Sequence, residues 1–363
     1  MTPTLQILTG DCREQLRTLP EESVHCCVTS PPYWGLRDYG HGGQLGQEAT
    51  PGEYIERMVE VFEEVRRVLR KDGTLWLNLG DTFAGSGRGA GYVHSANRGN
   101  PSSRTGSRVP CGYHEEARPG GAIGRAWVKP PLGLKQKDLC MIPHRVAMAL
   151  QAAGWWVRMD NVWSKPNPMP ESVEDRPTKA HEYIFLLSKS ADYHYDAAAI
   201  AEPAEYGAKG SHFDKGKTGA HQLGRASRKP RVSKVRGEFA GKTNELPGRE
   251  AFRAITETRN KRSVWTVPSQ PYAGAHFATF PPELFKSCIL AGCPRGGVVL
   301  DPFGGSGTTG AVALELERSA VLCELNPAYV RLIRQRCEKS RPHWAAPIPQ
   351  DLPAEDMPLF ATA

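Results

Sequence analysis

The sequence lacks the features that mark several large classes of protein. None of its 9 cysteines forms a C-x-x-C pair. No apolar run approaches the roughly 18 residues that a membrane-spanning helix requires. The first residues contain no basic stretch followed by an apolar one, as a secretory signal would. Scattered cysteines in an odd number, without such a signal, predict a reducing cytoplasmic environment. The lack of a long apolar run predicts no membrane contact. No metal site is expected either.

The composition is that of a globular chain with an excess of positive charge. Of the 363 residues, 39% are hydrophobic, which suffices for a large α/β domain and a smaller module. The formal net charge is +7, and it is unevenly distributed: residues 205–262 contain 15 Lys and Arg but only 6 Asp and Glu. This imbalance is typical of a surface that faces phosphates, and a solvated insertion is the alternative.

Strand and helix patterns alternate towards both ends of the chain. Residues 55–69 carry apolar side chains at i, i+3, i+4 and i+7, which predicts an amphipathic helix that Gly73 ends. Buried strands at 24–29 and 74–79 flank it, and such a β-α-β unit predicts a parallel sheet. Further strands are expected at 5–8, 155–163, 182–188, 297–300 and 319–324, and further helices at 143–153, 281–291, 308–316 and 327–337.

A glycine-rich turn follows one of the expected strands. Residues 301–310 read DPFGGSGTTG and contain a G-x-G-x-x-G pattern that starts at Gly305, and Glu324 ends the next strand. Glycines let the backbone approach a ligand closely, and the acidic residue can bind ribose hydroxyls. The pattern fits NAD, FAD or S-adenosylmethionine, with a ligand-free strand-to-helix turn as the alternative. A Walker A loop is excluded because no Lys follows the last glycine.

A second motif, Ser30-Pro31-Pro32-Tyr33, follows the strand expected at 24–29. In open α/β sheets, ligands bind beyond the carboxyl ends of the strands. Prolines have no N–H, so the Ser30 hydroxyl and the Pro31 carbonyl can accept both hydrogens of an exocyclic amino group. Tyr33 can stack on a base flipped out of a double helix. A Pro-Pro turn that merely ends a strand is the alternative.

The two motifs together resemble those of the S-adenosylmethionine-dependent DNA amino-methyltransferases, which modify cytosine N4 or adenine N6. The catalytic motif at 29–33 precedes the cofactor motif at 301–310, which is the order of the β class. The resemblance implies a doubly wound, mostly parallel, Rossmann-like α/β sheet that is circularly permuted and carries an inserted basic recognition region. The pattern agrees, because the strand at 5–8 has no helix before it and the helix at 327–337 has no strand after it.

The resemblance also assigns roles to matching positions. The catalytic residues would be Ser30, Pro31, Pro32 and Tyr33. The residues that contact S-adenosylmethionine would be Asp11, Phe280, Pro281, Asp301, Phe303, Gly305, Gly307 and Glu324. Among them, Glu324 would bind the ribose hydroxyls and Asp11 would meet the adenine edge. Residues 176–182 resemble the segment beside the flipped base, where His181 is either a general base or a structural residue.

The domain organisation and the partners follow from the same resemblance. The catalytic half of the domain would span 1–190, with a long flexible loop at 81–131. A target-recognition insertion would follow at 191–262, then the cofactor-binding half at 263–341 and a loose tail at 342–363. Double-stranded DNA would be the substrate, in the cytoplasm at the nucleoid, for a bacterial or phage-encoded enzyme. A homodimer and a cognate restriction endonuclease are compatible with it.

Several alternatives stay open at this stage. Ser30 favours cytosine N4, because adenine enzymes of the family usually carry Asp or Asn there, but either amine needs only an acceptor. A methyltransferase acting on RNA or on a protein amide could use the same motifs. A dinucleotide-dependent oxidoreductase would explain the glycines and leave Ser30-Pro31-Pro32-Tyr33 unused. A DNA-binding module with an inactive site would need no intact motif.

Overall fold

The computed structural model describes residues 2–36, 41, 43–84, 133–204, 258–270 and 280–343. Most of the predicted loop at 81–131, most of the basic segment and most of the tail lie outside these residues. The chain divides into two compact units, one formed by Met1–Ala199 with Ser263–Ala363 and the other by Ile200–Arg262. The four-part division expected from the sequence stays a prediction.

The larger unit is built on one sheet of eight strands, in the order β1-β10-β9-β2-β3-β5-β4-β8. The strands are β1 (Leu5–Thr9), β2 (Val24–Thr29), β3 (Leu69–Leu79), β4 (Trp156–Ser164), β5 (His181–Ser188), β8 (Val264–Thr266), β9 (Val298–Asp301) and β10 (Ser319–Glu324). The five strands from β1 to β3 are parallel, and β5 runs antiparallel to both β3 and β4. The predicted mostly parallel sheet is confirmed.

The two ends of the chain meet in this sheet. β1 pairs in parallel with β10, with Leu5 opposite Ala320 and Thr9 opposite Glu324. The first strand therefore occupies the place of the strand that the last helix lacks, as the predicted circular permutation requires.

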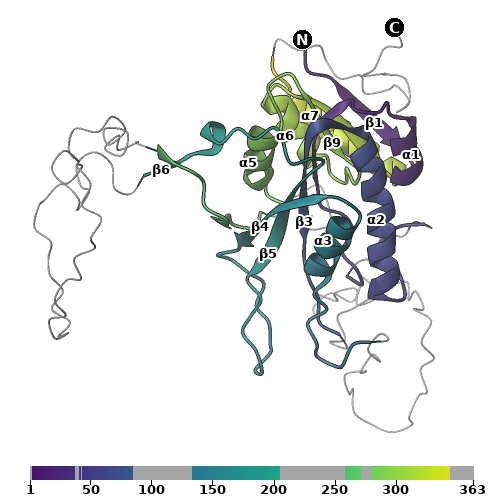
Figure 1. Cartoon of the computed structure of the whole chain (residues 1–363), viewed down its shortest axis with the longest axis vertical. Helices are drawn as coiled ribbons and strands as arrows, with labels where there is room; N and C mark the ends of the chain where they lie inside the picture. Colours follow the sequence, from purple (N-terminus) through teal and green to yellow (C-terminus); the bar gives the residue numbers. More distant parts are fainter. Residues whose placement is uncertain are drawn as a thin grey trace, which may run out of the picture. The chain divides into compact units, whose positions relative to one another are not determined.

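Among the described residues, six helices cover the two faces of the sheet. They are α1 (Cys12–Thr18), α2 (Pro51–Val68), α3 (Ile142–Ala152), α5 (Pro282–Gly292), α6 (Thr308–Glu315) and α7 (Pro327–Ser340). The connections β2-α2-β3 and β9-α6-β10 run in opposite directions along the sheet, so right-handed crossovers put α2 and α6 on opposite faces. α1 and α3 pack against α2, whereas α5 and α7 pack against α6 (Figure 1). No helix in the described ranges is long and apolar enough to span a membrane.

The smaller unit contains a two-stranded antiparallel sheet within its described residues. β6 (Glu202–Pro203) pairs with β7 (Thr258–Arg259). Glu202 accepts a hydrogen bond from Arg262 at 3.1 Å. The 3-10 helix η1 (Ala198–Ile200) precedes β6.

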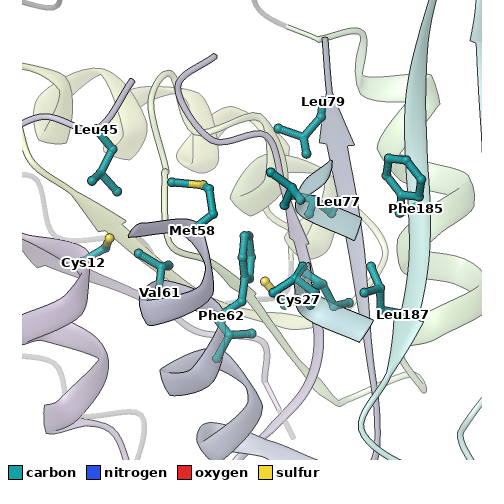
Figure 2. Packing of buried hydrophobic residues seen from close by; sticks show 14 of the residues in the cluster. Cys12, Cys27, Leu45, Met58, Val61, Phe62, Leu77, Leu79, Phe185 and Leu187 are labelled. Atoms are coloured by element: carbon teal, nitrogen blue, oxygen red, sulfur yellow. The ribbon is translucent and has the colours of Figure 1, made fainter. Parts of the chain in front are cut away.

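The largest part of the core lies between α2 and the sheet. Met58, Val61 and Phe62 on α2 are fully buried, and Figure 2 shows them beside side chains of β2, β3 and β5. Their i, i+3, i+4 spacing is the pattern that predicted this helix. Thr50 caps the helix by accepting a hydrogen bond from Glu53 N at 3.2 Å, and Pro51 occupies the first turn, where no N–H is needed.

The predicted end of this helix was wrong. α2 ends at Val68 rather than at Gly73, because Leu69 turns to an extended conformation and pairs with Val24 as the start of β3. Gly73 lies inside the strand, where a Cβ would approach the Arg70 carbonyl oxygen to 3.0 Å. The seven-residue helix α1 was not predicted, because it is too short for an apolar stripe to repeat.

Replacing Phe62 by Ala tests the importance of this core. The substitution removes a fully buried ring and should lower the free energy of unfolding by about 3–5 kcal/mol. Urea denaturation followed by circular dichroism measures it. Val264→Ala on the exposed edge strand β8 is the control, expected to change stability by less than about 1 kcal/mol. Equal effects of both substitutions would contradict this account of the core.

Candidate active site

The carboxyl ends of the parallel strands form one edge of the sheet, where β2 ends at Thr29 and β9 ends at Asp301. These strands are neighbours, and the chain leaves them towards opposite sides of the sheet, β2 to β3 and β9 to β10. Such a switch point is where ligands bind in open α/β sheets. β5 and β4 are antiparallel to each other, and Glu182 and Ser164 reach the same edge.

Asp301 joins the two sequence motifs at this switch point. Thr29 Oγ1 donates to its Oδ1 at 2.6 Å, and Thr309 Oγ1 donates to its Oδ2 at 2.6 Å. The Phe303 N–H donates to Oδ1 at 3.0 Å. The side chain is fully buried, and this burial raises its pKa to about 6. Three donors occupy its two oxygens, so Asp301 organises the loop, and its direct contact with a cofactor stays a prediction.

The glycines of the loop do different work. Gly307 has a φ of +80°, and a Cβ there would lie 3.0 Å from Ile333 Cα, so it permits close packing on α7. Gly305 has a φ of +51°, and its missing side chain would meet only the Phe303 carbonyl oxygen, at 3.7 Å. Gly305 is therefore the position at which the backbone stays open to a ligand.

Glu324 lies at the end of β10, directly beside this open backbone. Its Oε2 accepts the Gly305 N–H at 2.7 Å, and its Oε1 accepts the Asn326 N–H at 2.8 Å. Burial raises its pKa to about 7. Each carboxylate oxygen retains acceptor capacity, so hydroxyl groups of a ligand can bind here.

The remaining predicted cofactor residues lie near Glu324 or directly before α5. Gly10 N donates to the Glu324 carbonyl at 2.9 Å, which brings Asp11 next to Glu324. Asp11 caps α1 and accepts from Arg13 Nε at 3.0 Å, and this hydrogen bond lowers its pKa. Phe280 stacks on Phe285 with 3.7 Å between the ring centroids, and Pro281 precedes α5. Their contacts with a cofactor stay predictions.

The segment from Ser30 to Tyr33 turns away from β2 in a fixed conformation. Tyr54 Oη on α2 donates to the Pro32 carbonyl at 2.9 Å. Within the described residues the Pro31 carbonyl accepts no hydrogen bond, so it is available to a ligand. The Tyr33 ring lies so close to Gly80 that a Cβ there would approach it to 2.5 Å.

The Tyr33 hydroxyl belongs to a network that the sequence did not predict. It donates to Glu182 Oε2 at 2.7 Å and lies 3.1 Å from Asn78 Oδ1. Ser30 Oγ donates to it at 3.4 Å. Burial and the charge of Glu182 raise the pKa of Tyr33 well above its usual value. The sequence does carry a signal for Asn78, because it is the one amide side chain in the apolar strand expected at 74–79.

His181 begins β5 at the same edge. Its ring is edge-on to Tyr183, with 5.3 Å between the centroids, and burial lowers its pKa. In the described part of the chain it makes no hydrogen bond to Ser30 or Tyr33. Both alternatives for His181, a general base or a structural residue, stay predictions.

Comparison with known proteins shows the family to which the chain belongs. The N6/N4 family described as DNA methylase matches residues 24–335. The chain belongs to this family. Type II methyltransferase M.SmaI of Serratia marcescens is 41% identical over 336 residues, covering 93% of this chain and 91% of that protein. Type II methyltransferase M.Cfr9I of Citrobacter freundii is 43% identical over 331 residues, covering 91% and 86%.

A solved structure supports the fold. The PvuII DNA methyltransferase (cytosine-N4-specific) aligns with a TM-score of 0.54 and 18% identity, over 93% of this chain and 87% of that one. The predicted S-adenosylmethionine-dependent DNA amino-methyltransferase is thus confirmed as the family of this chain, and the oxidoreductase alternative is excluded.

Glu324→Gln tests the electrostatics of the cofactor side. Burial raises the pKa of this carboxyl from 4.5 to about 7, so the folded protein binds its proton more tightly than the unfolded chain. Its contribution to stability is therefore present below pH 4.5 and is lost as the pH rises to 7. The variant should show a flatter decline over this range, by up to about 1.4 kcal/mol per pH unit. Urea denaturation of the ligand-free protein at several pH values measures it; parallel profiles would contradict the burial argument.

Proposed function

We propose that this protein transfers a methyl group from S-adenosylmethionine to the exocyclic amino nitrogen of a flipped base in a specific DNA sequence. The observation that carries the proposal is the 2.6 Å hydrogen bond between Thr29 and Asp301. Through it, the acceptor segment that begins at Ser30 lies beside the glycine-rich loop at the switch point of the sheet.

The cofactor side fits S-adenosylmethionine. This cofactor supplies an electrophilic methyl carbon on a positively charged sulfur. Asp11, Asp301 and Glu324 follow or end three strands at the same edge, and their carboxyl groups favour a cationic ligand. Glu324 would accept the ribose hydroxyls next to the open backbone of Gly305, because a hydrogen bond from the Gly305 N–H holds the two residues together. Asp301 would act by holding Phe303 and the loop in place.

The acceptor side fits an aromatic amine. The lone pair of such a nitrogen is delocalised into the base, so the nitrogen is a poor nucleophile. Ser30 Oγ and the Pro31 carbonyl would accept its two hydrogens, which favours a pyramidal nitrogen and stabilises the positive charge that develops during transfer. The Tyr33 ring, fixed against Gly80, would stack on the flipped base.

The target and the biological role are finer parts of the proposal. Ser30 favours cytosine N4 over adenine N6, since Asp or Asn is usual at that position in the adenine enzymes that the chain resembles. The segment 191–262, with its basic excess, would recognise the target sequence. The relatives are named type II methyltransferases, which supports a modification role in a restriction-modification system. A cognate endonuclease, a homodimer and a cytoplasmic location at the nucleoid belong to the same proposal.

The direct test incubates unmethylated DNA with the protein and isotopically labelled S-adenosylmethionine. Mass spectrometry of the hydrolysed nucleosides should find labelled N4-methylcytosine. Labelled N6-methyladenine would correct the base and keep the reaction. Label on RNA or on protein glutamine, with none on DNA, would overturn the proposal in favour of another amide or amine substrate.

Ser30→Ala separates catalysis from cofactor binding. Loss of one acceptor should lower kcat by roughly 10- to 1000-fold. The affinity for S-adenosylmethionine should stay within about twofold, because Glu324 and the glycine-rich loop are unchanged. Steady-state kinetics and calorimetry measure the two quantities. Ser23→Ala is the matched control, since that hydroxyl is exposed and only donates to the Pro20 carbonyl. An unchanged kcat in Ser30→Ala would remove Ser30 from the mechanism.

A further inference from the structure

As an acceptor for the amino group of the base, the Ser30 hydroxyl differs from the Pro31 carbonyl, which can only accept. It can donate its proton or accept one, whereas an amino group about to be methylated needs acceptors. If the Ser30 proton pointed at the amino nitrogen, it would compete for the lone pair that attacks the methyl carbon. Something must therefore fix the direction of the Ser30 proton.

The network around Tyr33 supplies this direction. The Tyr33 hydroxyl has one proton, and its nearest partners are both acceptors, Glu182 Oε2 at 2.7 Å and Asn78 Oδ1 at 3.1 Å. The proton thus points away from Ser30. The Tyr33 oxygen is left to accept, and Ser30 Oγ lies 3.4 Å from it as a donor. With its proton turned inward, Ser30 presents lone pairs to the site.

The orientation of Asn78 is fixed by the same contacts. Its Nδ2 donates to the Tyr183 carbonyl at 3.1 Å and to Glu182 Oε2 at 3.3 Å. Both partners are acceptors, so the amide nitrogen must face them and Oδ1 must face Tyr33. An inverted amide would place its oxygen against the Tyr183 carbonyl and Glu182 Oε2, which are both acceptors.

Glu182 is held as a charged acceptor from its other side. Lys165 Nζ pairs with Glu182 Oε1, and both side chains are largely buried. The Lys165 ammonium also lies 4.2 Å from the centre of the Trp163 ring. Trp163 Nε1 in turn donates to the Val267 carbonyl at 2.8 Å. The Lys165 ammonium can only donate, so Glu182 Oε1 accepts from it, and Glu182 Oε2 is left to accept from Tyr33.

We propose that Glu182 is a positioning residue which, through the Tyr33 hydroxyl, orients the Ser30 proton inward and so makes Ser30 an acceptor for the amino group of the base. This inference rests on the proposed function, because it concerns the same reaction. The Tyr33 side chain then has two roles. Its ring is available to stack on the base, and its hydroxyl donates to Glu182 and accepts from Ser30.

The test measures single-turnover methylation in Glu182→Gln and Tyr33→Phe, each in the wild-type and in the Ser30→Ala background. Gln can present an N–H to Tyr33, and Phe removes the hydroxyl while it keeps the ring. Each substitution should slow methyl transfer by roughly 10- to 100-fold in the wild-type background. In the Ser30→Ala background each should slow it by less than about twofold, because the hydroxyl to be oriented is gone.

Two further readouts separate orientation from simple support of the ring. 2-Aminopurine at the target position, once the methylated sequence is known, reports base flipping and should give the wild-type signal in both variants. Glu315→Gln is the matched control; this exposed residue pairs with Lys286 at 3.6 Å, its one ion pair in the described part of the chain, and the substitution should leave the rate unchanged. Losses that persist in the Ser30→Ala background, or a lost flipping signal, would overturn the orienting role. No labelled base on DNA with the wild-type protein would instead overturn the proposed function.

Discussion

The site depends on one buried carboxylate, Asp301, at the end of β9. Its hydrogen bond from Thr29 connects the segment that begins at Ser30 to the glycine-rich loop at 301–310. Because the group is fully buried, losing one of its three donors would leave it with fewer hydrogen bonds in the interior, at a cost in stability. The relative position of the two motifs is therefore set by the same requirement that keeps this carboxylate satisfied.

Around this connection, the two sides of the site are organised by different means. On the cofactor side the backbone does most of the work, since Glu324 accepts two N–H groups and the glycines either pack or stay open. On the amine side the side chains dominate, and they come from three strands, with Tyr33 following β2, Asn78 on β3 and Glu182 on β5. The parallel part of the sheet brings the two motifs together, and the antiparallel strand β5 adds Glu182, which accepts the Tyr33 hydroxyl hydrogen bond.

The sequence predicted what depends on local patterns. The amphipathic stripe of α2, the apolar strands and the two motifs at strand ends each lie within a short stretch of chain. Glu182 lies in the segment 176–182 that was expected beside the flipped base, but its hydrogen bond with Tyr33 was not predicted. Tyr33 is far away in sequence, and the antiparallel pairing of β3 with β5 brings the two together. Asp301 was expected to face a ligand, but no pattern reveals that Thr29, Phe303 and Thr309 occupy its oxygens. The end of α2 at Val68 was hidden because Leu69 continues the apolar stripe.

The pairing of β1 with β10 has a consequence for synthesis on the ribosome. β2 emerges early and must wait for β9 before one of its long edges is covered, and β1 must wait for β10. Contacts of such large sequence separation form slowly, because the loop-closure entropy must be overcome first. The sheet of the nascent chain therefore stays incomplete until β9 and β10 have been synthesised. A chain that is interrupted early contains the segment at Ser30 but lacks the glycine-rich loop at 301–310. DNA is then modified only by chains that were translated through β10.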